Sequence, residues 1–153
     1  MADHSLFQPV LRWLIKGKGK AVYGGTRYKR ELKTAGRYLG LFSELRKAGK
    51  IVEVDGSKVD KYQKQIEEKV RKSKFNDAHL IGIVVVSGCL LVCTNDKEAI
   101  PYLKRNSLYP KGVNKPKIYT SNSNKNLLCD ANIAAVCKPT CKVTYDLQVA
   151  FGI

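Results

Sequence analysis

The feature that most constrains the fold is an apolar stretch in the middle of the chain, NDAHLIGIVVVSGCLLVCTND (76–96). Its first part, 78–87, is rich in β-branched residues, so periodicity alone does not separate a buried helix from a buried strand. Gly88 divides it from a second apolar run, 90–93, which has the length of a buried strand. Because strands and helices alternate elsewhere in the chain, a helix is favoured for 78–87. The pattern predicts an α/β fold, a mostly parallel sheet flanked by helices.

The remaining elements follow the same alternation. The residues Thr26 and Ser57 are of the type that caps helix N-termini. We find no internal repeat and no linker, so residues 1–153 are expected to form a single domain. Short strands are predicted at 21–23, 51–54, 117–119 and 142–145, and further helices at 7–15, 27–32, 37–48, 57–73 and 97–103.

The charge of the chain points to a polyanionic partner. There are 28 Lys and Arg residues against 13 Asp and Glu, which gives a net charge of +15. Such an excess is beyond what solubility requires and favours nucleic acid, with an acidic protein or a membrane surface as the alternatives. The chain has no apolar run of the roughly 20 residues that span a bilayer. Together with an odd count of five cysteines, this predicts a cytoplasmic protein.

Two other kinds of site are less well supported. The pair Cys137 and Cys141, with Cys129 nearby, fits a zinc site only loosely, because such a site needs four thiolate or imidazole ligands. His79 lies on the predicted helix 78–87, where it is interpreted as a packed helix residue. A cysteine nucleophile would need a positioned base, and none is evident.

Three acidic residues stand apart from the others. Glu31 follows a predicted strand and a Gly-Gly turn, Asp77 stands at the head of the apolar helix, and Asp96 follows the strand 90–93. In open α/β sheets, ligand sites gather at the carboxyl ends of strands and the adjoining helix starts. Carboxylates collected there repel one another unless a divalent cation such as Mg²⁺ or Mn²⁺ neutralises them. Taken singly, the same residues fit a helical ion pair, a helix cap and a turn.

The segment 76–96 resembles the central pattern of the PIN domain, a nuclease family with a parallel sheet and a carboxylate metal site. In that pattern an Asp opens an apolar helix, and a Gly, an apolar strand and Thr-x-Asp follow. Upstream, GGTRYKREL (24–32) is similar to the strand-turn-helix unit that carries the family's Glu. The resemblance implies metal ligation by Glu31, Asp77 and Asp96, with Thr94 and Asn95 supporting the site.

One part of the PIN pattern is not found in its usual place. The family begins with an apolar strand ending in Asp-x-Asn, which lies in the middle of the sheet and gives the first metal ligand. The C-terminal sequence KVTYDLQVAFGI (142–153) looks like this unit, with Asp146 as the ligand and Gln148 in place of Asn. The hypothesis is a circularly permuted PIN-like domain whose first strand comes from the C-terminus.

The resemblance implies an endoribonuclease that hydrolyses single-stranded or structured RNA with Mg²⁺ or Mn²⁺ as cofactor. It also implies a toxin neutralised by a protein antitoxin, and a homodimer. The alternative is a catalytically inactive, basic RNA-binding module, and a third class is an adaptor that binds an acidic protein. The residues proposed to contact RNA are Lys18, Lys20, Arg27, Lys29 and Arg30.

Overall fold

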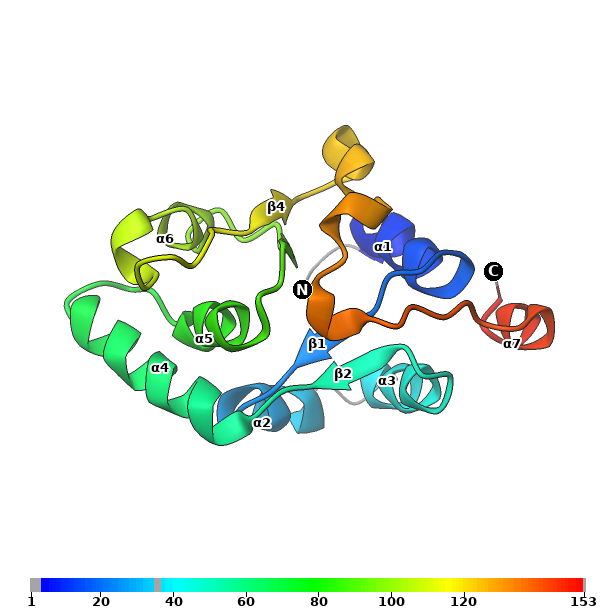
Figure 1. Cartoon of the computed structure of the whole chain (residues 1–153), viewed down its shortest axis with the longest axis horizontal. Helices are drawn as coiled ribbons and strands as arrows, with labels where there is room; N and C mark the ends of the chain where they lie inside the picture. Colours follow the sequence, from blue (N-terminus) through cyan, green and yellow to red (C-terminus); the bar gives the residue numbers. More distant parts are fainter. Residues whose placement is uncertain (1–3, 35–36, 153) are drawn as a thin grey trace.

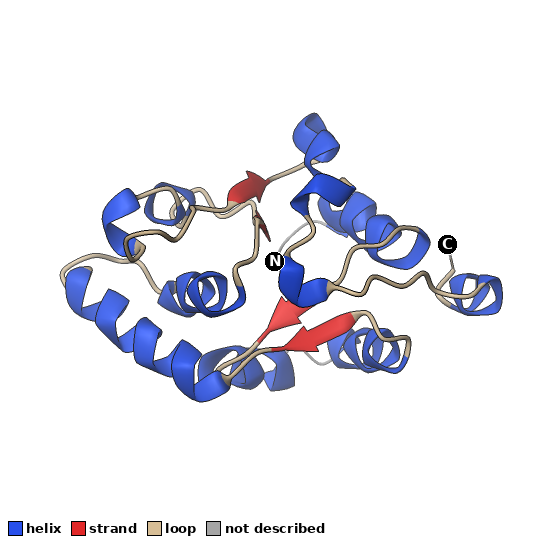
Figure 2. Cartoon of the chain, in the orientation of Figure 1, coloured by secondary structure: helices blue, strands red, loops and turns tan. Residues whose placement is uncertain are grey.

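A computed structural model describes the backbone of residues 4–34 and 37–152 and the side chains of residues 8–31 and 40–152. In it, four short strands form two parallel pairs in the middle part of the molecule, with helices on several sides of them (Figures 1 and 2). The strands are β1 (Ala21–Tyr23), β2 (Ile51–Glu53), β3 (Leu91–Cys93) and β4 (Lys117–Tyr119). The predicted α/β class is therefore confirmed, as are the strand at 21–23 and the helical interpretation of 78–87.

The five other predicted helices are found, but the one predicted at 57–73 ends at Lys69, the one predicted at 97–103 begins only at Ile100, and the C-terminal helix was not predicted. The α-helices are α1 (His4–Lys16), α2 (Thr26–Thr34), α3 (Arg37–Lys47), α4 (Gly56–Lys69), α5 (Ala78–Ser87), α6 (Ile100–Leu103) and α7 (Tyr145–Ala150). Short 3₁₀ helices are η1 (Asn106–Leu108), η2 (Asn122–Leu127), η3 (Asp130–Asn132) and η4 (Ala135–Cys137). Within the part of the chain described, no helix is long and apolar enough to span a bilayer.

The strands form two separate two-stranded sheets instead of one continuous sheet. β1 pairs in parallel with β2, and β3 pairs in parallel with β4. A cavity of about 270 Å³ lies between them, because residues of both β1 and β3 line it, together with α1, α5 and the segment η3–η4. Among the described strands, neither β1 nor β3 has a second partner.

The strand predicted at 142–145 is wrong. Residues 140–144 are irregular, and Tyr145 begins the short helix α7, whose first turn contains Asp146. The hydroxyl of Thr144 accepts a hydrogen bond from the Leu147 N–H, so a local N-cap competes with the extended conformation that the β-branched residues favour. The permuted first strand is therefore not formed in this structure.

Two predicted caps are also corrected. The N-cap of α4 is Asp55, whose carboxylate accepts hydrogen bonds from the N–H groups of Ser57 and Lys58. At α2, the N–H and hydroxyl of Thr26 both donate to the carboxylate of Asp60, at 2.9 and 2.7 Å. The Asp60 carboxylate on α4 therefore accepts hydrogen bonds from the first residue of α2. This contact holds the start of α2 against α4.

The packing of α5 places the acidic residues. Gly82 on α5 approaches α4 so closely that an added Cβ would lie 2.9 Å from the carbonyl oxygen of Val59. Ile81 and Val84 from α5 and Ile66 from α4 belong to one apolar core. The buried face of α5 thus fixes its N-terminus, and with it the residues that precede and open the helix.

Candidate metal centre

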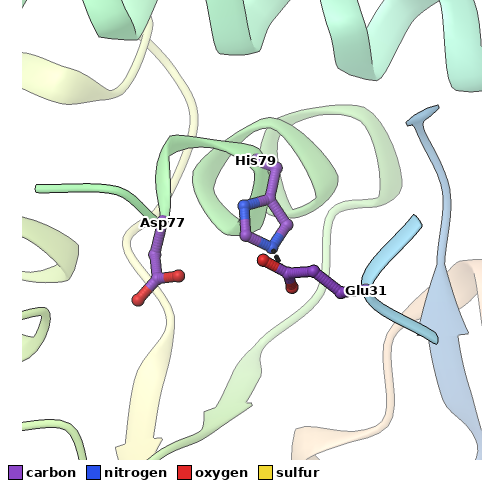
Figure 3. A group of neighbouring side chains, drawn as sticks. All are labelled: Glu31, Asp77 and His79. Carbon is purple, nitrogen blue, oxygen red and sulfur yellow. Dashed lines mark ion pairs between the residues drawn. The ribbon is translucent and has the colours of Figure 1, made fainter. Parts of the chain in front are cut away.

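Glu31, Asp77 and His79 converge at the N-terminus of α5 (Figure 3). Glu31 comes from α2, Asp77 is the residue before α5, and His79 lies in the first turn of α5. Each offers one ligand atom, and these atoms all lie within 4.8 Å of one another. Two of the four sequence-predicted ligands, Glu31 and Asp77, are therefore brought together, and His79 joins them in place of Asp96 and Asp146.

The turn after β1 directs Glu31 to this point. Gly25 has a φ of +92°, a conformation that favours glycine, and an added Cβ there would lie 2.8 Å from Cγ1 of Val59. The chain therefore reverses tightly from β1 into α2. One carboxylate oxygen of Glu31 accepts a hydrogen bond from Nε of Arg27 at 2.9 Å, and the other lies 3.3 Å from Nε2 of His79.

Asp77 does not act as the helix cap that its position suggests. Although it is the N-cap residue of α5, its side chain makes no capping hydrogen bond within the described residues. Burial raises the pKa of the Asp77 carboxyl, and the negative charges of Asp96 and Glu31 raise it further. A carboxylate held in this way is destabilised as an anion and would gain from a neighbouring cation.

His79 is almost completely buried, with 2% of its surface exposed. Burial lowers the pKa of its imidazole below the ordinary value of 6.5, so the ring is neutral at pH 7. Its Nδ1 atom is buried and has no hydrogen-bond partner within the described part of the chain. A neutral imidazole is the form that binds metal ions, so the burial of His79 suits it to this role. The prediction that His79 is a packed helix residue is confirmed by its burial. It did not include the acidic neighbours Glu31 and Asp77.

Asp96 lies beside the cluster without joining it. Its carboxylate accepts hydrogen bonds from the N–H groups of Glu98 and Ala99, at 2.9 and 3.3 Å, just before α6. The hydroxyl of Thr94 accepts a hydrogen bond from the Asp96 N–H at 3.2 Å, and the supporting role predicted for Thr94 at the metal site stays a prediction. Asn95 is exposed in the same turn. The influence of Asp96 on the cluster is electrostatic, through the raised pKa of Asp77.

The C-terminal residues are not brought to the cluster. Asp146 is exposed on α7, which lies at the edge of the molecule, far from α5 (Figure 1). The side-chain amide of Gln148 donates to the carbonyl of Val143 at 3.1 Å. Among the described residues the metal-binding group is limited to Glu31, Asp77 and His79.

The basic residues predicted to bind RNA do not share one surface. Arg27 and Arg30 line a groove of about 620 Å³ between α2 and α4, which Lys61 and Lys64 line from the other side. The sequence pattern did not single out these two α4 lysines, although their spacing of three residues places them on one helix face. Elsewhere, Lys29 forms an ion pair with Glu53 at 2.8 Å, Lys20 donates to the carbonyl of Pro139 at 3.0 Å, and Lys18 is exposed beyond α1.

The groove and the cluster are adjacent, because Arg27 lines the groove and binds Glu31. The arrangement offers two carboxylates and an imidazole beside a set of cations that could hold a polyanion. Comparisons of this chain with models of known protein families, with curated proteins and with solved structures find no match.

Proposed function

We propose that this protein is a divalent-metal-dependent ribonuclease with a PIN-like fold, and that the Glu31–Asp77–His79 cluster is its metal site. The observation that carries the proposal is the convergence of three ligand atoms within 4.8 Å around a half-buried carboxylate that makes no capping hydrogen bond within the described residues. The net charge of +15 supports a nucleic-acid substrate.

The donor set favours Mn²⁺ over Mg²⁺. Carboxylates suit both ions, whereas an imidazole ligand is less suited to the hard Mg²⁺ ion. A bound ion would supply Lewis acidity at a phosphate and lower the pKa of a water molecule. Glu31, Asp77 and His79 would hold the ion, and Arg27 would keep the Glu31 carboxylate oriented.

The PIN-like part of the proposal rests on the sequence resemblance. The family's first strand lies in the middle of its sheet, and in this chain the two separate sheets leave a cavity that residues of β1 and β3 both line. The chain continues from the carboxyl end of β1 into α2, which carries Glu31, and from the carboxyl end of β3 to Asp96. The resemblance depends on these two acidic residues. Asp146 as a further ligand stays a prediction, which requires a rearranged C-terminal segment.

The groove between α2 and α4 is proposed to hold the RNA backbone. We expect the double variant Arg30→Ala with Lys64→Ala to weaken single-stranded RNA binding. The slope of log K against log salt should fall by about 1.4, because each lost phosphate contact contributes about 0.7 for a single strand. Fluorescence anisotropy over a salt series measures this slope. The matched control Lys111→Ala with Lys115→Ala removes two exposed lysines outside the groove, and an equal effect there would contradict a defined RNA site.

The test of the proposed activity is cleavage of a mixed single-stranded RNA pool in Mn²⁺, Mg²⁺ and chelator. We expect cleavage with Mn²⁺, less with Mg²⁺ and none in chelator. Glu31→Gln should abolish it, whereas Glu98→Gln, a matched change at an exposed glutamate, should not. Cleavage that persists in chelator, or survives in Glu31→Gln, would contradict a metal site at the cluster.

A specific observation favours the alternative of an inactive RNA-binding module. The Asp96 carboxylate is engaged with the N–H groups of Glu98 and Ala99, so one predicted ligand has a structural role. In that case the groove would still bind RNA, and binding would be equal in Mn²⁺ and in chelator with the RNA intact.

A further inference from the structure

The unpaired edges of β1 and β3 face the same cavity. In a parallel pair, one residue directs its N–H and C=O to the partner strand and the next directs them to the other side. The N–H of Ala21 donates to Lys50 and the carbonyl of Tyr23 accepts from Val54, so the backbone groups of Val22 point away from β2. Val22 also lines the cavity.

The same alternation applies to β3. The carbonyl of Leu90 accepts from Lys117 and the N–H of Thr94 donates to Tyr119, both on the side of β4. The backbone groups of Leu91 and Cys93 therefore point away from β4, and both residues line the cavity. Within the described residues these backbone groups have no partner, and two such strand edges along one apolar cavity form an acceptor for an additional strand.

The C-terminal segment 144–151 has the pattern of such a strand. Tyr145, Leu147 and Val149 are exposed by 77%, 37% and 58%, and they occupy alternate positions. This spacing suits one face of a strand, whereas on a helix Leu147 lies on the opposite side from the other two. Only six residues of the segment form α7, and an isolated helix of that length is marginal in water.

The chain upstream of this segment is fixed to its own molecule. Val143 is buried against Leu14, Ile15 and Leu45, and Nζ of Lys50 donates to the carbonyl of Cys141 at 2.6 Å. From residue 144 the segment runs to the edge of the molecule, away from β1 and β3 (Figure 1), and within it Phe151 packs against the same apolar core. An exchange into the cavity of another molecule keeps the contacts of Val143 and Lys50 and gives up the packing of Phe151 and the hydrogen bond from Gln148 to the Val143 carbonyl.

Charge also favours this pairing. Two copies with a net charge of +15 repel each other, yet 144–151 contains no Lys or Arg and carries one Asp. Lys20 lines the cavity, so the acceptor offers a cation to the one charged residue of the segment. We propose that residues 144–151 of one copy add as a strand between β1 and β3 of a second copy, and that reciprocal exchange closes a dimer.

The first test is the mass of the full chain in solution, measured by light scattering over a concentration series. We expect a dimer that Leu147→Asp and Val149→Asp each weaken by at least about tenfold, because each would bury an unpaired carboxylate. Both positions are exposed in the single chain, so these changes should leave its fold intact. Val136→Asp, at an exposed valine outside the segment, is the matched control. A monomeric wild type, or an effect at Val149 without one at Leu147, would overturn the strand.

The second test maps the contact directly. In a Leu147→Cys variant oxidised under mild conditions, we expect disulfide-linked dimers joining the introduced thiol to Cys89, Cys93 or Cys137, which line the cavity. Peptide mass mapping of unreduced digests identifies the link. A link to the same cysteines within a monomer would show that the segment fills its own cavity. That result, or links only to Cys129 or Cys141, would overturn the proposed exchange.

Discussion

Replacement of Asp77 by asparagine should abolish metal-dependent RNA cleavage while leaving the metal-free protein at least as stable as the wild type. The loss of activity should be at least about 100-fold, because even outer residues of metal sites often contribute 10- to 100-fold. The stability half of the prediction follows from the position of the carboxylate, which is half-buried and caps no helix within the described residues.

The direction of the stability effect can be worked out from the pKa of Asp77. Burial raises this pKa in the folded state above its ordinary value of 3.8, so the folded protein holds the proton more tightly than the unfolded chain. Stability therefore falls as the pH rises from 3.8 through the raised pKa. Asparagine removes the charge and with it this loss of stability.

Thermal unfolding with and without Mn²⁺ measures the stability and the response to the ion, and RNA cleavage in Mn²⁺ measures the activity. The wild type should be stabilised by the ion, and Asp77→Asn should not respond to it. Asp130→Asn, at an exposed aspartate, is the control and should behave as the wild type in both assays. A metal-free Asp77→Asn protein that is clearly less stable would instead mean that the carboxylate has a structural role.

Replacement of Lys50 by methionine should lower the free energy of unfolding by about 2 kcal/mol, the scale of buried polar groups left without a partner. Lys50 is fully buried, and its ammonium donates to the carbonyls of Gly17 and Cys141, at 3.2 and 2.6 Å. It thereby joins the end of α1 and the start of β2 to the chain at Cys141, upstream of the segment 144–151. Methionine fills a similar volume but leaves both carbonyls without this donor.

The pH dependence of the Lys50→Met effect gives an independent check. Burial lowers the pKa of the Lys50 ammonium in the folded state below 10.5, so the unfolded chain holds the proton to a higher pH. The wild type should therefore gain stability relative to Lys50→Met as the pH rises toward that value. Urea unfolding between pH 7 and 10 measures the difference, with Lys47→Met at an exposed position as the control. A constant difference would contradict a buried ammonium.

Local patterns predicted most of the secondary structure. The helix at 78–87 followed from its place between alternating strands and helices, and the structure confirms it. The segment 142–145 failed because its β-branched residues fit a strand equally well in isolation, whereas the Thr144 cap and the buried Val143 hold it in another conformation. The local cap and the tertiary contacts of Val143 together set the conformation there, and a short window of sequence does not contain the tertiary contacts.

The candidate site was also predicted only in part, because local patterns indicated some of its residues and not others. Glu31 and Asp77 were predicted because each stands at the junction of a strand or turn with a helix. His79 was missed because a single histidine on an apolar helix is usually a packing residue, although its spacing of two from Asp77 at a helix start was a usable signal. The buried Lys50 had no such signal, since nothing in the sequence around it differs from the many exposed lysines.

The free edges of β1 and β3 have a consequence for hydrogen exchange. Amide protection should alternate along these strands, with Ala21 and Thr94 slow because their N–H groups are bonded to a neighbouring strand. Val22, Leu91 and Cys93 should exchange quickly in any molecule whose cavity holds no strand. Residue-resolved deuterium uptake thus separates the single chain from the paired one, and it needs neither a substitution nor a substrate.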